Sequence, residues 1–461
     1  MTDYTNRTFD EIDVGARETS TRTLTAAEIE GLALVAGDVD RFHLDGEGRG
    51  DGRAAPGTAA VAVVSNLLLR RLPGPGAAIV ETNLRYAGAI VAGDTLTATV
   101  VVRSKDPATH HIVFDCTCSN DRGDLLVEGR AVVTAPVERV AYTDVVTPEL
   151  ILRRHDGFAR LIARCKTLAP VPCAVVHPCD RDSLLGALEA ARYGLIVPVL
   201  VGPEAKIRAV AAADGIDLSP WRIVATEHSH AAAAKAVELA RAGDVEALMK
   251  GSLHTDELMG AIVPSTSGLR TARRISHVFV MDVPTYPRLL LITDAAINIS
   301  PDLEVKADIV RNAIDLARVL GIPTPCVAVL AAVETVNPKL QSTIDAAALC
   351  KMADRGQIEG GVIDGPLAFD NAISAHAAKT KNIVSPVAGR ADILVMPDLD
   401  AGNMVAKQLQ YLAGADCAGI VLGTRVPIVL TSRADTIRTR IASAAVLQLV
   451  AHSRRMARPI V

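Results

Sequence analysis

Aromatic side chains are scarce in this sequence: Phe, Tyr and Trp together make up 3% of its 461 residues. Proteins that bind nucleic acid often stack bases on aromatic side chains and attract phosphates with a basic surface. This chain has a net charge of -4 and a pI near 6.3, so it offers no broad attraction to polyanions. We therefore expect no nucleic-acid partner, and any recognition of phosphate must be local.

The sequence also lacks the marks of an exported or membrane protein. No apolar run approaches the ~18 residues that a membrane-spanning helix needs, and the polar, acidic N-terminus does not resemble a signal peptide. The eight cysteines show no CxxC pairing and lie mostly in apolar runs. We interpret them as reduced thiols of a hydrophobic core, and we expect a cytoplasmic protein without a metal site.

The chain is too long for one hydrophobic core, and its periodicity changes near residue 140. Thr25 and Glu28 form a capping-box pattern at the start of a helix, and a long apolar helix is expected from Thr58 to Leu72. Alternating patterns then predict strands at 78–86, 95–103, 111–119 and 125–134. We expect an α+β domain at 1–136 in which a sheet wraps around a helix, a linker at 137–148, and a second domain at 149–461.

From Glu149 onward, strand and helix patterns alternate, which predicts a mostly parallel sheet with helices on both faces. The expected strands are 174–177, 195–201, 223–226, 247–250, 277–281, 289–293, 327–330, 393–396, 420–422 and 428–431. Ligands of such sheets bind at the carboxyl ends of the strands. The polar residues that follow these strands are therefore candidate binding residues, and they include Lys250, Asp294, Asn298, Glu334 and Asp364.

The clearest chemistry lies where the last expected strand meets the last expected helix. The run Val426 to Thr431 is apolar and is followed by Ser432, Arg433 and Asp435. A hydroxyl, a guanidinium and a carboxylate at a helix N-terminus, where free N–H groups point outward, form a site that can bind a phosphate group.

Several ordered segments of the second domain resemble phosphate acetyl/butyryl-transferases. The resemblance covers about residues 150 to 455 and rests on Met249-Lys-Gly251, Gly268-Leu-Arg270, Ile275-Ser-His-Val-Phe-Val-Met281, Thr293-Asp-Ala-Ala-Ile-Asn298, Ala332-Val-Glu-Thr-Val-Asn337, Asp364-Gly-Pro-Leu-Ala-Phe-Asp370 and Leu430-Thr-Ser-Arg-Ala-Asp435. It implies an α/β/α fold of two subdomains, similar to the isocitrate-dehydrogenase type, with the active site between the subdomains and a homodimer as the usual assembly. The implied reaction is reversible acyl transfer between coenzyme A and inorganic phosphate, with no permanently bound cofactor.

The same resemblance implies roles for individual residues. Arg433 would bind the phosphate or acyl-phosphate oxygens, Ser432 would donate a hydrogen bond in the transition state, and Arg270 matches a second anion-binding arginine. The reaction also needs a base, because a thiol with a pKa near ~8.5 is mostly protonated at neutral pH. In acetyl-transferring relatives the carboxylate that acts as this base lies seven residues after the serine, where this chain has Thr439. Asp435 is the nearest substitute, and a role as helix N-cap alone is the alternative.

The first domain resembles MaoC-like enoyl-CoA hydratases, which have a hot-dog fold. The resemblance rests on Gly37-Asp38-Val-Asp40-Arg-Phe-His43-Leu-Asp45 and on later segments around Leu72, Leu84 and Gly93. Asp38 and His43 would hold the water that adds to a double bond, and the backbone N–H of Gly57 would polarise the thioester carbonyl. The family's Ala-His-Gly is replaced by Ala55-Pro56-Gly57, and the preceding loop is short and glycine-rich, so a degenerate domain that binds a CoA thioester or dimerises is the alternative.

Both halves would handle acyl-CoA, so the combined interpretation is a bifunctional enoyl-CoA hydratase and phosphate acyltransferase. Three alternatives come from other classes of protein. One is a fold-mate that oxidises a hydroxy acid with NAD and a metal, although Asp294, Asp364 and Asp370 do not have a metal-binding spacing. The others are an acyl-phosphate synthase that uses acyl-carrier protein and a non-catalytic, CoA-responsive scaffold or regulator.

Overall fold

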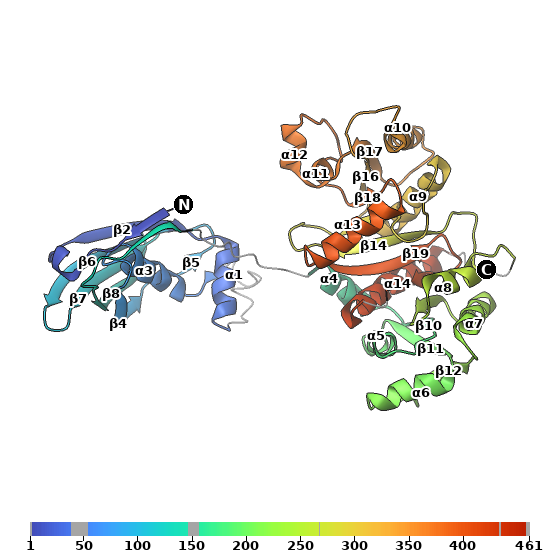
Figure 1. The fold of residues 1–461 in the computed structure, drawn as a ribbon, viewed down its shortest axis with the longest axis horizontal. Helices are drawn as coiled ribbons and strands as arrows, with labels where there is room; N and C mark the ends of the chain where they lie inside the picture. The colour runs from blue at the N-terminus through green and yellow to red at the C-terminus, as the bar shows by residue number, and fades with distance from the viewer. Residues whose placement is uncertain (1, 38–53, 146–155, 267, 433–434, 458–461) are drawn as a thin grey trace. The chain divides into compact units, whose positions relative to one another are not determined.

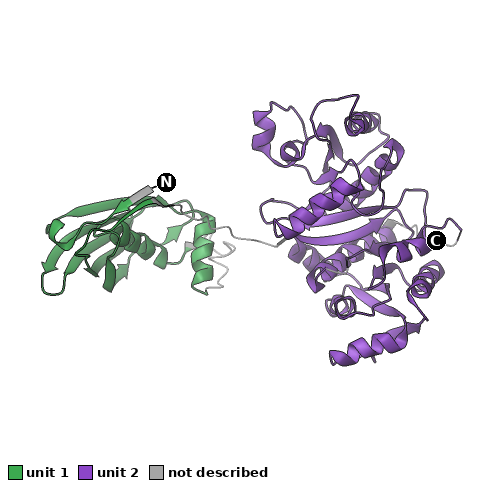
Figure 2. Ribbon diagram, in the orientation of Figure 1, with its two compact units in different colours: residues 1–152 green, residues 153–461 purple. Residues whose placement is uncertain are grey.

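The computed structural model describes residues 2–37, 54–145, 156–266, 268–432 and 435–457 (Figure 1). The chain divides into two compact units, Met1–Leu152 and Arg153–Val461, which Figure 2 distinguishes by colour. In the part that the structure describes, no helix is long and apolar enough to cross a membrane. No group of three or more His, Cys, Asp or Glu side chains is arranged to hold a metal ion among the same residues.

The first unit is an antiparallel sheet that wraps around one helix. The sheet has the strand order β2-β6-β7-β8-β4, and helix α3 packs against all five strands. The buried positions of β6 and β7 alternate with less buried ones, so one face of the sheet covers the apolar side of α3. This is the hot-dog arrangement expected from the sequence. Its elements are β1 (Thr2–Thr5), η1 (Phe9–Glu11), β2 (Arg17–Thr23), α1 (Ala26–Val35), β3 (Ala54–Ala55), α3 (Thr58–Arg70), β4 (Ala78–Tyr86), β5 (Ile90–Val91), β6 (Thr95–Asp106), β7 (His111–Ser119), β8 (Leu125–Thr134) and β9 (Ala141–Val145).

Two details of this unit can be compared with the sequence. The capping box at α1 is present, since the hydroxyl of Thr25 accepts the N–H of Glu28 and the carboxylate of Glu28 accepts the N–H of Thr25. The segment 137–148, expected as a linker, contains β9, which pairs antiparallel with β1. A five-residue edge strand is too short to produce a detectable period, and its partner lies more than 130 residues away in the sequence.

The second unit is built on one sheet of eleven strands, among the described residues, with the order β12-β11-β10-β13-β20-β19-β14-β15-β18-β16-β17. The strands are β10 (Val171–Val176), β11 (Ile196–Gly202), β12 (Arg222–Ala225), β13 (Ala247–Lys250), β14 (Ser276–Asp282), β15 (Leu290–Thr293), β16 (Cys326–Leu330), β17 (Val362–Leu367), β18 (Ile393–Val395), β19 (Asp416–Leu422) and β20 (Ile428–Val429). The helices are α4 (Asp156–Cys165), α5 (Arg181–Arg192), α6 (Glu204–Ala213), α7 (Ser229–Ala242), α8 (Thr255–Ile262), α9 (Leu303–Val319), α10 (Gln341–Asp354), α11 (Phe369–Ile373), α12 (Ala375–Thr380), α13 (Leu399–Tyr411) and α14 (Ile437–Ala457).

This sheet is parallel at both ends and antiparallel in the middle. The pairs β20–β19, β19–β14 and β14–β15 are antiparallel, whereas the pairs on either side of them are parallel. The two parallel groups therefore run in opposite directions and form the two subdomains of an α/β/α fold. The sequence predicted a mostly parallel sheet, and it missed the reversal because a fully buried strand has the same apolar pattern in either direction.

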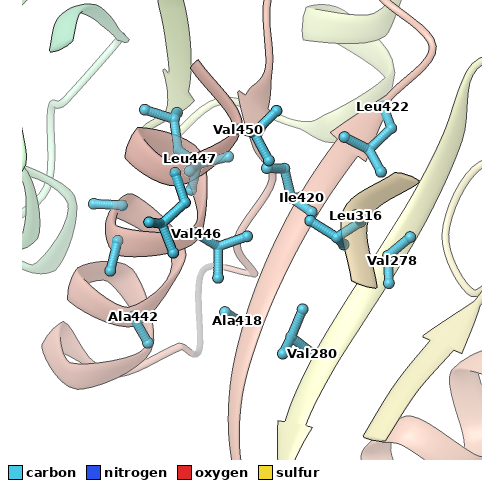
Figure 3. Close-up of a cluster of buried hydrophobic side chains, with 14 of the residues drawn as sticks. Val278, Val280, Leu316, Ala418, Ile420, Leu422, Ala442, Val446, Leu447 and Val450 are labelled. Carbon is cyan, nitrogen blue, oxygen red and sulfur yellow. The ribbon is translucent and has the colours of Figure 1, made fainter. Parts of the chain in front are cut away.

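Helices cover both faces of the sheet, as expected from the sequence. Figure 3 shows α14 packed through Ala442, Val446, Leu447 and Val450 against the strand side chains Ala418 and Ile420. The opposite face is covered by α7 and α8 in one subdomain and by α13 in the other. The eight cysteines are all free thiols, and five of them are buried.

Candidate active site

Two hydrogen bonds join Ser432 and Asp435 between β20 and α14, and we call this pair of contacts the Ser432 turn. The backbone N–H of Ser432 donates to Oδ2 of Asp435 at 2.6 Å, and the N–H of Asp435 donates to the carbonyl oxygen of Ser432 at 3.2 Å. The helix cap is a different residue, because the N–H of Thr439 donates to the hydroxyl of Thr436 at 3.2 Å. The carboxylate of Asp435 therefore holds the backbone of Ser432, and Thr436 is the residue that caps α14. Arg433 lies outside the described residues.

Asp435 is also tied to the opposite subdomain. The residue is 3% exposed, and its Oδ1 accepts a hydrogen bond of 3.3 Å from Nε2 of Gln410 on α13. Its negative charge helps to raise the pKa of the Cys417 thiol to about 12, with burial as the main cause. A carboxylate that contacts both the Ser432 turn and α13 lies where the two subdomains meet.

Lys250 lies beside the same turn. It is the last residue of β13, is 3% exposed, and donates from Nζ to the carbonyl oxygen of Thr431 at 3.3 Å. Because β13 and β20 are parallel neighbours, their carboxyl ends meet at one edge of the sheet. The structure thus brings together three predicted site residues, Lys250, Ser432 and Asp435.

Two other predicted residues, Arg270 and Asn298, line a separate pocket of about 810 Å³. Arg270 forms an isolated bridge with Thr424, which follows β19, and it makes no ion pair with any described residue. Arg273 and Arg274 line the same pocket, and Asp315 neutralises Arg273 through a 2.7 Å contact. The carboxylates of Asp256, Glu304 and Asp308 also line the pocket, so its charge is mixed and Arg270 is one of three arginines in it.

Asn298 connects parts of the pocket lining through hydrogen bonds. Its Nδ2 donates to the carbonyl oxygen of Ile275 at 2.9 Å and to Oδ2 of Asp294 at 2.6 Å, while its Oδ1 accepts from Nε of Arg274 at 3.0 Å. Asp294 also accepts the backbone N–H groups of Ala296 and Ile297 at 2.9 and 3.0 Å. The Asp294 to Asn298 segment therefore holds the loop after β15 and orients Arg274.

The pocket and the Ser432 turn lie at opposite ends of β20. Thr424, the bridge partner of Arg270, precedes this strand, whereas Ser432 follows it. The reversal of strand direction in the middle of the sheet causes this separation, since the carboxyl ends of β15 and β20 point to opposite edges.

The sequence analysis did not select two buried polar side chains near the turn, Arg440 and His277. Arg440 donates to the hydroxyl of Thr431 at 2.8 Å. His277 is fully buried, and its ring lies beside the backbone of Leu430. Burial lowers the pKa of His277 to about 4, and Asp294 and Asp435 act in the opposite direction. Their sequence signals were weak, since Arg440 lies inside a helical pattern and His277 inside a strand.

In the first unit, the structure describes one of the three predicted site residues. Gly57 is the N-cap of α3, and a Cβ atom at this position would lie 3.0 Å from Cδ1 of Tyr86. Because glycine has no Cβ atom, the start of α3 can lie against the ring of Tyr86. Asp38 and His43 lie outside the described residues.

Comparison with known proteins decides the family of the second unit. The family model described as phosphate acetyl/butaryl transferase matches residues 221–448. A phosphate acetyltransferase of Rhizobium meliloti is 65% identical over 300 residues, which cover 65% of this chain and 95% of that protein. This chain belongs to the phosphate acetyl/butyryl transferase family.

Further members of this family support the assignment. A phosphate butyryltransferase of Clostridium acetobutylicum is 41% identical over 298 residues, covering 65% of this chain and 99% of that protein. Among solved structures, a branched-chain phosphotransacylase from Enterococcus faecalis V583 superposes with a TM-score of 0.55 at 28% identity, covering 61% of this chain and 99% of that one. The phosphate acetyl/butyryl transferase relationship thus extends over nearly the whole length of these proteins and corresponds to the second unit here.

Proposed function

We propose that residues 153–461 catalyse the reversible transfer of a short acyl group between coenzyme A and inorganic phosphate. The observation that carries this proposal is the contact between Ser432 and Asp435 at the carboxyl end of β20. Lys250 lies beside it at the end of the parallel strand β13, and the chain belongs to this family. In one direction a phosphate oxygen bonds to the thioester carbonyl carbon, and the carbon–sulfur bond breaks. Coenzyme A leaves as a thiolate that takes up a proton, and acyl phosphate remains.

The residues of the turn have separate roles in this proposal. Arg433 binds phosphate oxygens, and Ser432 donates a hydrogen bond where negative charge develops on the carbonyl oxygen. The ammonium group of Lys250 holds the carbonyl of Thr431 and adds positive charge beside the turn. Together these groups stabilise the phosphate and the transition state without a covalent enzyme intermediate.

Asp435 is the proposed base for the thiol of coenzyme A. Its Oδ2 is occupied by the short bond from the N–H of Ser432, whereas its Oδ1 accepts the longer 3.3 Å bond from Gln410. An ionised carboxylate oxygen can accept more than one hydrogen bond, so Oδ1 is the atom that takes the thiol proton. Thr439 has no comparable capacity, because a hydroxyl group is not a base at neutral pH.

The pocket around Arg270 suits the other end of coenzyme A. Coenzyme A carries its phosphates at the far end of a long pantetheine arm from its thiol. The pocket with Arg270 lies where β20 begins and the reactive turn lies where β20 ends, and we propose that one coenzyme A molecule reaches both. Arg270 would therefore bind coenzyme A phosphates, while Arg433 binds the phosphate that reacts. Free cysteines are compatible with a cytoplasmic location, where both substrates occur.

For the first unit we propose a MaoC-like domain that binds a CoA thioester and hydrates it weakly or not at all. A pocket of about 680 Å³ lies among α1, α3 and β2, with an apolar wall that includes Leu32, Val63 and Leu67. Arg70 and Arg71 also line it. An apolar wall with arginines beside it suits a ligand that joins an acyl chain to phosphates.

The outer strand of this sheet, β4, supports a homodimer. Among the described strands none pairs with the free edge of β4, on which Val80 and Tyr86 are both 55% exposed. An uncovered edge of this length is prone to pair with another strand. If two copies pair antiparallel about Asn83, Glu81 lies opposite Arg85 and Val80 opposite Tyr86. This self-complementarity favours a second copy of the chain as the partner.

Charge exchange tests the dimer. Glu81→Arg places like charges opposite each other, without removing the pair that Arg85 forms with Glu128 of its own sheet, and is expected to shift the full chain toward monomer in sedimentation analysis. The double variant Glu81→Arg, Arg85→Glu restores opposite charges and should restore the dimer. A double variant that remains as dissociated as the single one would contradict pairing about Asn83.

A thiol-release assay tests the enzymatic function. The full chain is mixed with acetyl-, propionyl- or butyryl-CoA, with and without inorganic phosphate, and the free thiol is measured. We expect thiol release that depends on phosphate. Turnover with acyl-carrier protein in place of CoA would favour an acyl-phosphate synthase, and absence of thiol release with all substrates would favour a non-catalytic CoA-responsive scaffold or regulator.

A further inference from the structure

The guanidinium group of Arg440 is buried against the Ser432 turn. Arg440 lies in the first turn of α14 and is 1% exposed. Its two terminal nitrogens donate to the hydroxyl of Thr431 at 2.8 Å and to the carbonyl oxygen of Ser432 at 3.2 Å. Arg440 thus contacts both residues that lead into Arg433.

The positive charge of Arg440 has no direct counter-ion in the part of the chain that the structure describes. Neither described hydrogen-bond acceptor is a carboxylate, and its Nε has no hydrogen-bond partner among the described residues. Burial lowers the pKa of Arg440, while the more distant carboxylates of Asp180, Asp435 and Asp182 oppose this effect. A buried cation without an ion-pair partner is costly, and a hydroxyl and a carbonyl do not require a cation as their donor. Stability alone therefore gives little reason for an arginine here.

Helix α5 provides the space for this side chain at Gly186. A Cβ atom at position 186 would lie 2.4 Å from Cδ of Arg440 and 3.0 Å from its Cβ. Glycine in a helix interior costs about 0.5–1 kcal/mol relative to alanine. The buried guanidinium of Arg440 and the glycine inside α5 are therefore both unfavourable for the stability of the fold. This indicates that the arginine is kept for a purpose other than packing.

We propose that Arg440 is a positioning residue for acyl transfer, and this inference rests on the proposed function of the Ser432 turn. Its guanidinium fixes the hydroxyl of Thr431 and the carbonyl of Ser432, and so sets the direction in which the turn presents its donors. Its charge also attracts the phosphate that binds at the turn, and that phosphate supplies the missing counter-charge. Lys250 holds the carbonyl of Thr431 from the neighbouring strand, so the turn lies between two buried cations.

Kinetics that vary phosphate and acyl-CoA separately test this role. We expect Arg440→Met to lower kcat/KM for phosphate by about a hundredfold, mainly through a raised KM for phosphate, with the KM for acyl-CoA unchanged. Arg440→Lys keeps the charge and is expected to recover part of the loss. Arg438→Met is the matched control, since Arg438 lies two residues earlier on α14 but is 60% exposed and pairs with Asp416.

Direct binding of inorganic phosphate separates this inference from the proposed function. The Kd of phosphate is measured by calorimetry on the wild-type chain and on each variant, without any turnover. A weakening of about tenfold or more in Arg440→Met, and none in Arg438→Met, supports the inference. Equal phosphate Kd and KM in wild type and a folded Arg440→Met protein would overturn it. A wild-type chain that binds phosphate but transfers no acyl group refutes the proposed function instead.

A second variant covers the case in which Arg440→Met does not fold. Gly186→Ala retains the guanidinium but forces the Arg440 side chain to move, and it should weaken phosphate binding in the same direction. Gly260→Ala in α8 is its control, because a Cβ at that position meets no atom within 4 Å. Phosphate binding of wild-type strength in a folded Gly186→Ala protein, with the arginine displaced, would contradict the positioning role.

Discussion

Ser432 and Asp435 hold each other in a closed turn: the N–H of Ser432 donates to Oδ2 of Asp435 at 2.6 Å, and the N–H of Asp435 donates back to the carbonyl of Ser432 at 3.2 Å. The turn lies between the last strand of one subdomain and the long helix α14, and Gln410 of α13 contacts the same carboxylate. Movement of α13 relative to this strand would change the environment of Asp435.

Replacing Arg433 by alanine should lower acyl transfer by about a hundredfold or more, or on the order of 3 kcal/mol, because a charge-assisted contact to the phosphate in the transition state is lost. Phosphate-dependent thiol release measures the effect. Arg438→Ala, which removes an exposed arginine from the same segment, should leave the rate unchanged. Near-normal turnover in a folded Arg433→Ala protein would refute the assigned role.

Asp435→Asn should slow acyl transfer, measured as consumption of free thiol from coenzyme A and acyl phosphate, because an amide cannot take the thiol proton. The amide oxygen can still accept the N–H of Ser432, so the turn should persist. Thr436→Ala removes the helix cap, costs about 1 kcal/mol of stability and should spare turnover. If Asp435→Asn shows normal kinetics and Thr439→Ala does not, the proton-transfer role belongs at position 439.

The full chain should hydrate crotonyl-CoA weakly or not at all. Asp38 and His43 keep the spacing of the MaoC-like family, but Pro56 and the glycine-rich loop before it alter the substrate wall, and a displacement of ~1 Å can cost about a hundredfold in rate. Loss of the absorbance of the double bond measures hydration. Robust hydration that Asp38→Asn abolishes would show that the first unit is an active hydratase.

The fold should lose stability in mild acid because of His277. Its pKa is lowered from 6.5 to about 4 by burial, so between these values the unfolded chain binds a proton at this position and the folded chain does not. Stability therefore falls as the pH drops through this window, by up to about 1.4 kcal/mol per pH unit. The melting temperature of His277→Leu should depend less on pH between 7 and 5 than that of wild type. His254→Asn, at an exposed position, should behave like wild type, and equal pH dependence in all three proteins would contradict this account.

Much of the fold was predictable because local patterns are strong where one face of an element is buried. The strands at 78–86, 111–119 and 125–134 agree with the structure residue for residue, and in 111–119 buried side chains alternate with less buried ones, as one covered face of an antiparallel sheet requires. Strand β17 was not predicted as a strand. It contains the polar and turn-forming residues Asp364, Gly365 and Pro366, whose composition indicates a loop.

Of the candidate site, the sequence by itself selected the residues that are predicted to carry the chemistry: Ser432, Arg433, Asp435 and Lys250 were chosen from residue type and from their positions after buried strands. Only the tertiary structure decided which of them meet. Strand direction depends on hydrogen bonds between strands that are far apart in the sequence, and the antiparallel pairs β20–β19, β19–β14 and β14–β15 place Arg270 and Asn298 at the opposite end of β20. Arg440 also became visible only in three dimensions, because a helical pattern does not reveal that Gly186 of another helix leaves space for a buried guanidinium beside Ser432.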